Sequence, residues 1–308
     1  MISEAVLQAI KGYTKEENIH LQEPMAAHTT FRVGGPTDCF LEISEKEELQ
    51  KICSYLSKTG TPYYVIGKGS NLLVSDKGFR GVILRVGPGM DQIHVDGTRL
   101  FAQAGATMAQ VARTAMENGL SGLEFASGIP GTVGGGVVMN AGAYGGEMKQ
   151  VVRNVEVLTA DGEFWNLDNE TMEFGYRTSS IRGHAYIVTE VEFELKQSDP
   201  GTILAKMEEL AAKRREKQPL EFASAGSTFK RPTGYYAGEL IMNTGLRGYR
   251  IGGAQVSEKH CGFVVNTEPG TTRAEDIMQL IRYIQKSVAE QHEVELEPEV
   301  IFLGEFDE

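Results

Sequence analysis

Residues 122–147 carry the groups best suited to hold a large ligand, and those groups are backbone amides. Nine of these 26 residues are glycine, and no charged side chain lies between Glu124 and Glu147. A glycine inside a helix or strand costs about 0.5–1 kcal/mol relative to alanine, so we expect no stable helix or strand here. The stretch is also too apolar for a solvated linker, and a buried backbone needs hydrogen-bond partners. We therefore predict a backbone clamp on a large phosphate-containing cofactor.

This stretch has two other possible interpretations. A membrane-spanning helix is disfavoured, because Pro130, Asn140 and the glycines interrupt the apolar run. A hairpin within the core stays open as the alternative to the clamp.

A second glycine turn follows the apolar run 63–66 and comprises Gly67, Lys68, Gly69, Ser70 and Asn71. The turn is not a P-loop, because the lysine is followed by glycine rather than by serine or threonine. A dinucleotide fingerprint is also excluded, since leucine stands where the third glycine or alanine is required. A strand followed by such a turn predicts a nest of backbone N–H groups that binds an anion.

Composition and charge exclude several classes of partner. The net charge of −12 disfavours binding to nucleic acid or to an anionic membrane, both of which require a basic face. The three cysteines are widely spaced and the six histidines show no metal-ligand spacing, so we expect reduced thiols and no metal site. The first residues lack the features of a signal peptide. We expect a cytoplasmic protein with no obligate protein partner.

The pattern of apolar residues predicts the elements that would position these loops. Helices are expected over 3–17, over 44–58 with a Ser44–Glu47 capping box, over 107–118, around 203–211, and over 274–290. Strands are expected over 39–43, 63–66, 81–85, 92–95, 99–104, 151–160, 163–167, 186–195 and 293–303, and loops over 28–36 (with a strand-like centre) and 219–235. Asp161-Gly162 is a strong hairpin signal. The polar run 196–201 is the best boundary, and the fold class is α+β with a cofactor domain before it and a smaller α/β domain after it.

Seven motifs together resemble the UDP-N-acetylenolpyruvoylglucosamine reductases, which are flavoenzymes of bacterial cell-wall synthesis. They lie in family order at 28–35, 66–71, 128–131, 139–144, 176–179, 226–230 and 299–300. The resemblance implies an FAD-binding domain of the vanillyl-alcohol-oxidase (PCMH) type in two subdomains, 1–78 and 79–196, and a C-terminal substrate-binding domain, 197–308. The segment between Tyr176 and Tyr186 is too short for the extra tyrosine-bearing loop of one subgroup, so the chain is similar to the subgroup without it.

The resemblance also implies the reaction. NADPH would reduce non-covalently bound FAD, which would then reduce the enolpyruvyl ether of UDP-N-acetylglucosamine to UDP-N-acetylmuramate. Arg177 would stabilise the charge that develops on the carboxylate, Ser227 would donate the proton, and Glu299 would act as an acid beside the carboxylate. From spacing alone each has an ordinary interpretation: a surface arginine in a hairpin loop, a turn serine, and one glutamate on the solvated face of an edge strand.

Binding residues are carried over from the family in the same way. For FAD they are Gly67, Lys68, Gly69, Ser70, Asn71, Gly128, Ile129, Gly131, Thr132, Gly135, Asn140 and Val188. For the substrate they are Tyr176, Arg214, Gln218 and Lys230. Two rival functions are a flavin oxidase on the same cofactor domain, which would use oxygen rapidly, and a nucleotide-binding protein without catalysis, which would not need Arg177, Ser227 and Glu299 together.

Overall fold

Residues 1–307 are described by a computed structural model, in which the chain forms two units. Unit 1 contains residues 1–20, 39–68 and 81–214, and unit 2 contains residues 21–38, 69–80 and the chain from Arg215 onward. No helix among the described residues is both long and apolar enough to cross a membrane. The predicted division at 78 and 196 stays a prediction.

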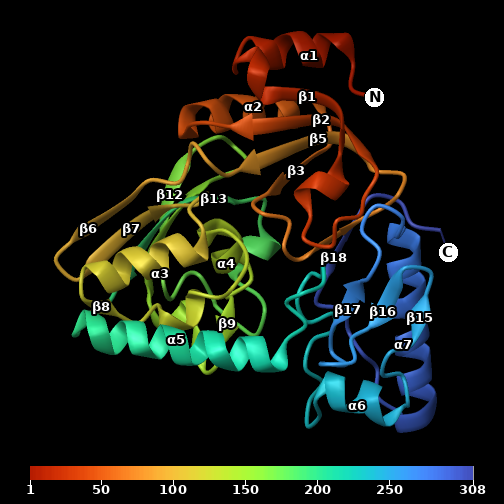
Figure 1. Cartoon of the computed structure of the whole chain (residues 1–308). Helices are drawn as coiled ribbons and strands as arrows, with labels where there is room; N and C mark the ends of the chain where they lie inside the picture. The colour runs from red at the N-terminus through yellow and green to blue at the C-terminus, as the bar shows by residue number, and fades with distance from the viewer. Residues whose placement is uncertain (308) are drawn as a thin grey trace. The chain divides into compact units, whose positions relative to one another are not determined.

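The helices and strands are labelled in Figure 1. The helices are α1 Glu4–Lys11, α2 Lys46–Thr59, α3 Met108–Glu117, α4 Val133–Val138, α5 Pro200–Lys217, α6 Ala237–Asn243 and α7 Ala274–His292. The strands are β1 Ile19–Pro24, β2 Pro36–Ile43, β3 Tyr63–Ile66, β4 Leu72–Val74, β5 Phe79–Val86, β6 Ile93–Asp96, β7 Arg99–Gln103, β8 Leu120–Ser121, β9 Gly142–Ala143, β10 Gly146–Glu147, β11 Val152–Leu158, β12 Phe164–Asp168, β13 Ile187–Glu194, β14 Lys196–Gln197, β15 Arg250–Ile251, β16 Ala254–Val256, β17 Val264–Asn266 and β18 Ile301–Leu303.

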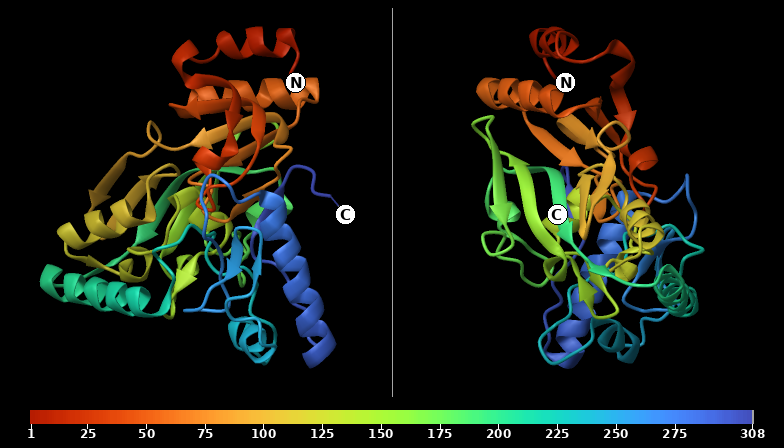
Figure 2. Two further views of the ribbon diagram at one scale, coloured as in Figure 1. Left: turned by 45° about the vertical axis from the view of Figure 1, so that its right-hand side comes forward. Right: turned by 90° about the vertical axis from the view of Figure 1, so that its left-hand side faces the viewer.

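Unit 1 is built on a five-stranded antiparallel sheet with the strand order β12-β11-β13-β7-β6. The predicted Asp161-Gly162 hairpin is confirmed, because β11 pairs with β12 across this turn and Gly162 has φ 84°. The strands β3 and β5 belong to a four-stranded sheet of order β1-β2-β5-β3, where they run parallel. Helix α1 lies against α2 in both views of Figure 2, and the Tyr55 hydroxyl of α2 donates to the Ala5 carbonyl at 3.5 Å.

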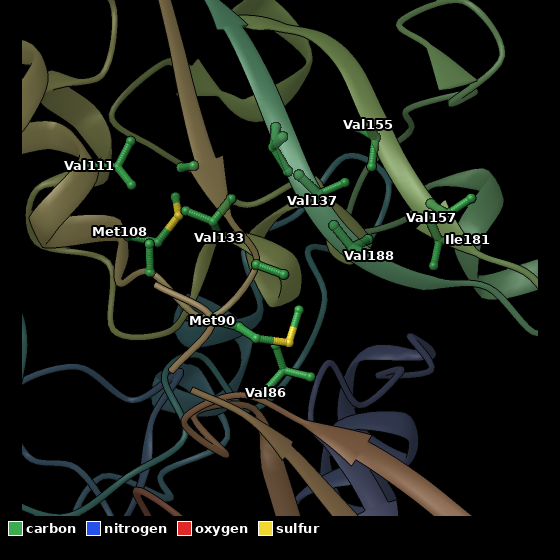
Figure 3. Packing of buried hydrophobic residues seen from close by; sticks show 14 of the residues in the cluster. Val86, Met90, Met108, Val111, Val133, Val137, Val155, Val157, Ile181 and Val188 are labelled. Atoms are coloured by element: carbon green, nitrogen blue, oxygen red, sulfur yellow. The ribbon is translucent and has the colours of Figure 1, made fainter. Parts of the chain in front are cut away.

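The glycine-rich stretch contains helix α4, so our expectation that it holds no helix is wrong at its centre. The reason is close packing. A Cβ on Gly134 would lie 2.9 Å from the Ala104 Cβ, and one on Gly136 would lie 2.9 Å from the Met108 sulfur. In Figure 3 the valines of α4 point into the core of unit 1, Val133 beside Met108 and Val137 toward β13. A hairpin, the alternative left open, is present at 142–147, where β9 pairs with β10.

Unit 2 has its own core around helix α7. This helix lies along the three-stranded antiparallel sheet β15-β16-β17 in Figure 1, and its residues Ile277, Ile281 and Ile284 are buried in the core cluster of this unit. A separate parallel pair joins β4 to β18, with Ile301 opposite Leu72. This pairing connects residues more than 200 positions apart, and the Ile301 amide donates to the Asn71 carbonyl at 2.9 Å.

Several boundaries differ from the sequence prediction. The N-terminal helix ends at Lys11 with Gly12 as its C-cap. The loop 28–36 has no strand at its centre. Helix α2 has Glu45 as its N-cap residue, and the Ser44 amide donates to Glu48 at 2.8 Å, so the Ser44–Glu47 capping box is wrong. Only 301–303 of the predicted strand 293–303 is regular. Helix α6 and the strands β15–β17 were not predicted.

Candidate active site

In unit 1, Gly67 packs closely against Thr132 where strand β3 ends, and we call Gly67, Gly131 and Thr132 the glycine cradle. A Cβ on Gly67 would lie 2.2 Å from the hydroxyl of Thr132, which is itself buried. The loop before α4 is held by an amide-to-carbonyl bond from Met108 to Gly131 at 3.2 Å, and Gly131 has φ 135°. Few residues other than glycine adopt this φ, so a substitution at Gly131 would strain the loop. Two predicted cofactor segments, 67 and 131–132, therefore meet in this unit.

Gly69, Ser70 and Asn71 lie in unit 2, where Gly69 packs against the 28–30 segment. A Cβ on Gly69 would lie 2.1 Å from the His28 carbonyl oxygen, and the Thr30 amide donates to the Gly69 carbonyl at 3.3 Å. The Thr30 hydroxyl is buried and has no hydrogen-bond partner within residues 1–307. A buried hydroxyl without a partner is costly unless a ligand satisfies it. Sequence reasoning assigned no role to Thr30, although it lies within the motif at 28–35.

Unit 2 also pairs the loop that carries Ser227 with the segment that carries Glu299, through an antiparallel bridge between Phe229 and Pro298. The Glu299 amide donates to the carbonyl of Thr228 at 2.8 Å, and the amide side chain of Asn71 donates to the Glu299 carbonyl at 2.9 Å. The Thr228 amide in turn donates to the Gly262 carbonyl at 2.8 Å. Two predicted site residues from distant parts of the sequence, Asn71 and Glu299, therefore share one hydrogen-bonded framework with Thr228, the neighbour of Ser227.

Ser227 and Glu299 differ in exposure from the neighbours that hold them. Ser227 is exposed, whereas Thr228 is fully buried and its hydroxyl accepts a hydrogen bond from the Val264 amide at 2.9 Å. Glu299 is half-buried, whereas Glu295 and Glu297 are exposed. The four glutamates of 293–299 therefore do not form one uniform solvated face, and Glu299 stands apart.

Arg177 lies in a tight turn of unit 1 and has a left-handed backbone, with φ 55°. The turn is closed by pairing between Gly175 and Thr178. The guanidinium is 5.3 Å from the ring centroid of Tyr176 and donates to the Gly142 carbonyl at 3.4 Å. An arginine at a position that favours glycine is a strained arrangement, and such strain is often found at functional sites.

Arg214 is a buried cation in unit 1. Its side chain contacts Gly128, where an added Cβ would lie 3.1 Å from Nε, and its guanidinium is 6.0 Å from the ring centroid of Tyr144. Burial lowers the pKa of Arg214, and Tyr144 partly offsets this effect. Within residues 1–307 no carboxylate pairs with Arg214, although a buried charge is normally paired. An anionic ligand would supply the missing partner.

The other predicted residues are less informative. Gly128 and Gly135 are exposed, Lys68 is exposed, Ile129 packs against the core of unit 1, and the Val188 side chain is buried in that core. Gln218 is the first residue after α5. The Lys230 ammonium pairs with Glu297, so a phosphate would compete with this carboxylate. Among residues 1–307 no group of three or more His, Cys, Asp or Glu could hold a metal ion.

The chain matches two family models. Residues 37–168 match the FAD-binding domain family, and residues 218–303 match the UDP-N-acetylenolpyruvoylglucosamine reductase C-terminal domain family. The structure of an alkyldihydroxyacetonephosphate synthase matches 64% of this chain with 41% of its own chain, at a TM-score of 0.51 and 14% sequence identity. At this identity the likeness shows the fold alone. The predicted fold class is confirmed: an FAD-binding domain of the vanillyl-alcohol-oxidase type and a C-terminal domain.

Relatives that match nearly the whole of this chain are UDP-N-acetylenolpyruvoylglucosamine reductases. The UDP-N-acetylenolpyruvoylglucosamine reductase of Caldanaerobacter subterraneus subsp. tengcongensis is 47% identical over 99% of this chain and 100% of its own. The reductase of Agathobacter rectalis is 51% identical over 92% of this chain and 93% of its own length. The solved reductase of Thermus caldophilus covers 93% of this chain and 98% of its own, with 37% identity and a TM-score of 0.80. This chain therefore belongs to the UDP-N-acetylenolpyruvoylglucosamine reductase family.

Proposed function

We propose that this protein is an FAD-dependent reductase that uses NADPH to convert the enolpyruvyl ether of UDP-N-acetylglucosamine to UDP-N-acetylmuramate, a peptidoglycan precursor. The observation that carries the proposal is the framework of unit 2, in which the Glu299 amide donates to the Thr228 carbonyl and so ties the segment that carries Glu299 to the loop that carries Ser227. We also propose that the protein acts in the cytoplasm, where its three cysteines would stay reduced.

The residues present fit FAD in two respects. Glycine is required at 67 and 69, since a Cβ there would lie within 2.2 Å of Thr132 or of His28, and this close packing fixes the turn whose backbone amides are proposed to hold the cofactor. The Thr30 hydroxyl is buried and has no partner in the described part of the chain, and a polar group of the cofactor would satisfy it. The residues proposed to hold FAD are those carried over from the family, with Thr30 added and with Asn140 offering its backbone rather than its side chain. When bound, FAD supplies hydride transfer between NADPH and the substrate.

Arg177 is assigned the substrate's carboxylate. Hydride addition to the terminal methylene leaves negative charge on the neighbouring carbon, and this charge spreads onto the carboxylate. A donor that is already oriented stabilises such charge as it develops. The planar guanidinium suits a carboxylate because it can donate two parallel hydrogen bonds. Contacts with the Tyr176 ring and the Gly142 carbonyl hold this group in one orientation.

Ser227 is assigned the proton that the neighbouring carbon must receive. A serine hydroxyl is a weak acid, so its position must compensate, and the buried Thr228 beside it fixes that position through three hydrogen bonds. Glu299 lies on the partner segment of the same framework and is assigned the acidic role beside the carboxylate. General acid catalysis of this kind contributes about 10²–10⁴-fold to a rate.

The pyrophosphate of the substrate needs cationic partners. Arg214 is the strongest candidate, because it is buried and no carboxylate of the described chain neutralises it. Lys230 would have to leave or share Glu297. Tyr176 and Gln218 complete the proposed substrate contacts, and Tyr176 is 55% exposed, which leaves its ring accessible.

The protein is expected to purify yellow, and acid denaturation should release FAD into solution, because no covalent link is proposed. Absorbance spectra of the protein and of the acid supernatant test this. A colourless protein that takes up no added FAD, or flavin that stays attached after denaturation, would contradict the proposal.

Gly67→Ala should reduce the amount of bound FAD. The new methyl group would lie 2.2 Å from the Thr132 hydroxyl, and overpacking of this kind costs about 1–3 kcal/mol. Flavin content per protein, read from absorbance, measures the effect. Gly183→Ala is the matched control, because an added Cβ there meets nothing within 4 Å. If the two variants bound equal amounts of flavin, Gly67 and its packing against Thr132 would have no role in binding FAD.

The central experiment is anaerobic. NADPH should bleach the flavin absorbance, and the enolpyruvyl substrate should restore it in the absence of oxygen. A flavin oxidase would instead be reoxidised rapidly by oxygen and not by this substrate. A nucleotide-binding protein without catalysis would show neither change.

A further inference from the structure

Asn140 joins three segments of unit 1 that are separate in sequence. Its side-chain amide donates to the Glu147 carboxylate at 3.0 Å and to the Gly175 carbonyl at 2.9 Å, and its side-chain oxygen accepts from the Lys149 amide at 2.9 Å. The residue is only 1% exposed. Both amide hydrogens are therefore used by the chain and the oxygen already accepts one hydrogen bond, so the side chain has no donor left for a cofactor.

The backbone of Asn140 does not explain why the residue is asparagine. Helix α4 ends in a Schellman motif, with the Ala141 amide bonded to the Gly136 carbonyl at 2.8 Å and the Asn140 amide bonded to the Val137 carbonyl at 3.1 Å. The residue after the C-cap of such a motif has a left-handed conformation, and Asn140 has φ 42°. Glycine is the usual residue there. The side-chain hydrogen bonds are what glycine would lack.

The segments that Asn140 joins are strained. Seven described residues other than glycine have positive φ, and four of them lie here: Asn140, Tyr144, Glu173 and Arg177. Such conformations cost on the order of 1–3 kcal/mol each and persist only where surrounding contacts enforce them. Tyr144 forms the turn of the β9–β10 hairpin with Gly145, and Glu147 at the end of this hairpin is one partner of Asn140.

Two anchors tie the arms of the Arg177 turn to the end of α4, in addition to the Arg182 guanidinium, which donates to the Arg177 carbonyl at 3.3 Å. Asn140 holds the first arm of the turn through the Gly175 carbonyl. The second arm is held by the Ser179 hydroxyl, which donates to the Val138 carbonyl at 3.0 Å. Both anchors lead back to the C-terminal end of α4. Loss of Asn140 would leave the second arm in place and release the first.

We propose that Asn140 is a positioning residue, whose side chain fixes the Arg177 turn and the Tyr144 hairpin in the geometry that the reaction requires. This inference rests on the proposed function, since it assumes that Arg177 meets the substrate's carboxylate. It assigns the Asn140 side chain to catalysis through Arg177 rather than to retention of the cofactor.

Asn140→Gly tests the proposal, because glycine accepts the same backbone conformation and removes only the side chain. We expect flavin content and flavin reduction by NADPH within about twofold of wild type. Reoxidation by the enolpyruvyl substrate should slow on the order of 10–100-fold, since misplacement of a positioned group by about 1 Å can cost 10²-fold. Stopped-flow absorbance measures the two half-reactions separately.

Glu293→Gly is the matched control. Glu293 is also left-handed, with φ 57°, at the C-terminal end of a helix, and its side chain is exposed. It should leave both half-reactions unchanged. Asn140→Asp is the second variant: it keeps the shape and the acceptor but replaces the two donors, and it should slow reoxidation at least as much as Asn140→Gly.

The outcomes separate the two proposals. Reoxidation at the wild-type rate in either Asn140 variant would overturn the positioning role. Loss of flavin in both variants would also overturn it and would assign the side chain to cofactor binding. If the wild-type flavin is not reoxidised by the enolpyruvyl substrate, the proposed function itself fails.

Discussion

Ser227→Ala should accept electrons from NADPH at a near-normal rate and then fail to pass them to the enolpyruvyl substrate. Reoxidation of the flavin by substrate should fall on the order of 10²–10⁴-fold, as expected for removal of a general acid. The two half-reactions are measured by anaerobic stopped-flow absorbance. If the variant turned over normally, Ser227 would revert to an ordinary turn residue after Gly226.

Ser227→Ala should remove the hydroxyl group without disturbing the loop that carries it. Ser227 is exposed, whereas the hydrogen bonds that hold the loop belong to Thr228, so truncation of the serine should leave the loop in place. Ser224→Ala in the same loop is the control for a nonspecific effect. Flavin content and the thermal midpoint should match wild type in both variants.

The sequence predicted regular elements well where local signals decide them. Helix α3 begins at its Thr107 cap, and the turn at Gly162 joins β11 to β12. The glycine-rich stretch shows where local reasoning fails. The helix penalty for Gly134 and Gly136 is real, but packing against Ala104 and Met108 requires glycine and overrides the penalty.

Pairing between distant segments could not be predicted from one sequence. Glutamates at alternate positions indicated a solvated edge strand over 293–299, yet the segment is irregular and Glu299 pairs with the loop at Thr228. The role of Asn140 was likewise hidden, because its partners Glu147 and Gly175 are brought to it only by the fold. The short strands β15–β17 have two or three residues each, too few for a periodic signal.

Arg177→Lys should slow reoxidation of the reduced flavin by substrate and leave reduction by NADPH near wild type. Lysine keeps the charge but loses the paired donors, so the variant tests geometry rather than electrostatics. The backbone strain at φ 55° is the same for both residues, so folding stability should change little. Arg113→Lys on the exposed face of α3 is the control for the substitution itself.

Glu299→Gln removes the acidic proton but keeps the shape, and it should depress the same half-reaction. An interaction made mainly in the transition state affects turnover more than ground-state binding, so kcat should fall more than the apparent affinity for substrate. Flavin content should not change, because the Glu299 amide and carbonyl, which hold the framework, are retained.

The structure decides which glutamate is the proper control for Glu299→Gln. Glu297 pairs with Lys230, so its substitution would also disturb a proposed substrate contact. Glu295 is exposed and lies four residues away, so Glu295→Gln changes the charge of the segment by the same amount without touching that pair. We expect Glu295→Gln to leave both half-reactions unchanged. If Glu299→Gln behaved like Glu295→Gln, the acidic segment would be only a solvated edge, and the role of Glu299 would have to be abandoned.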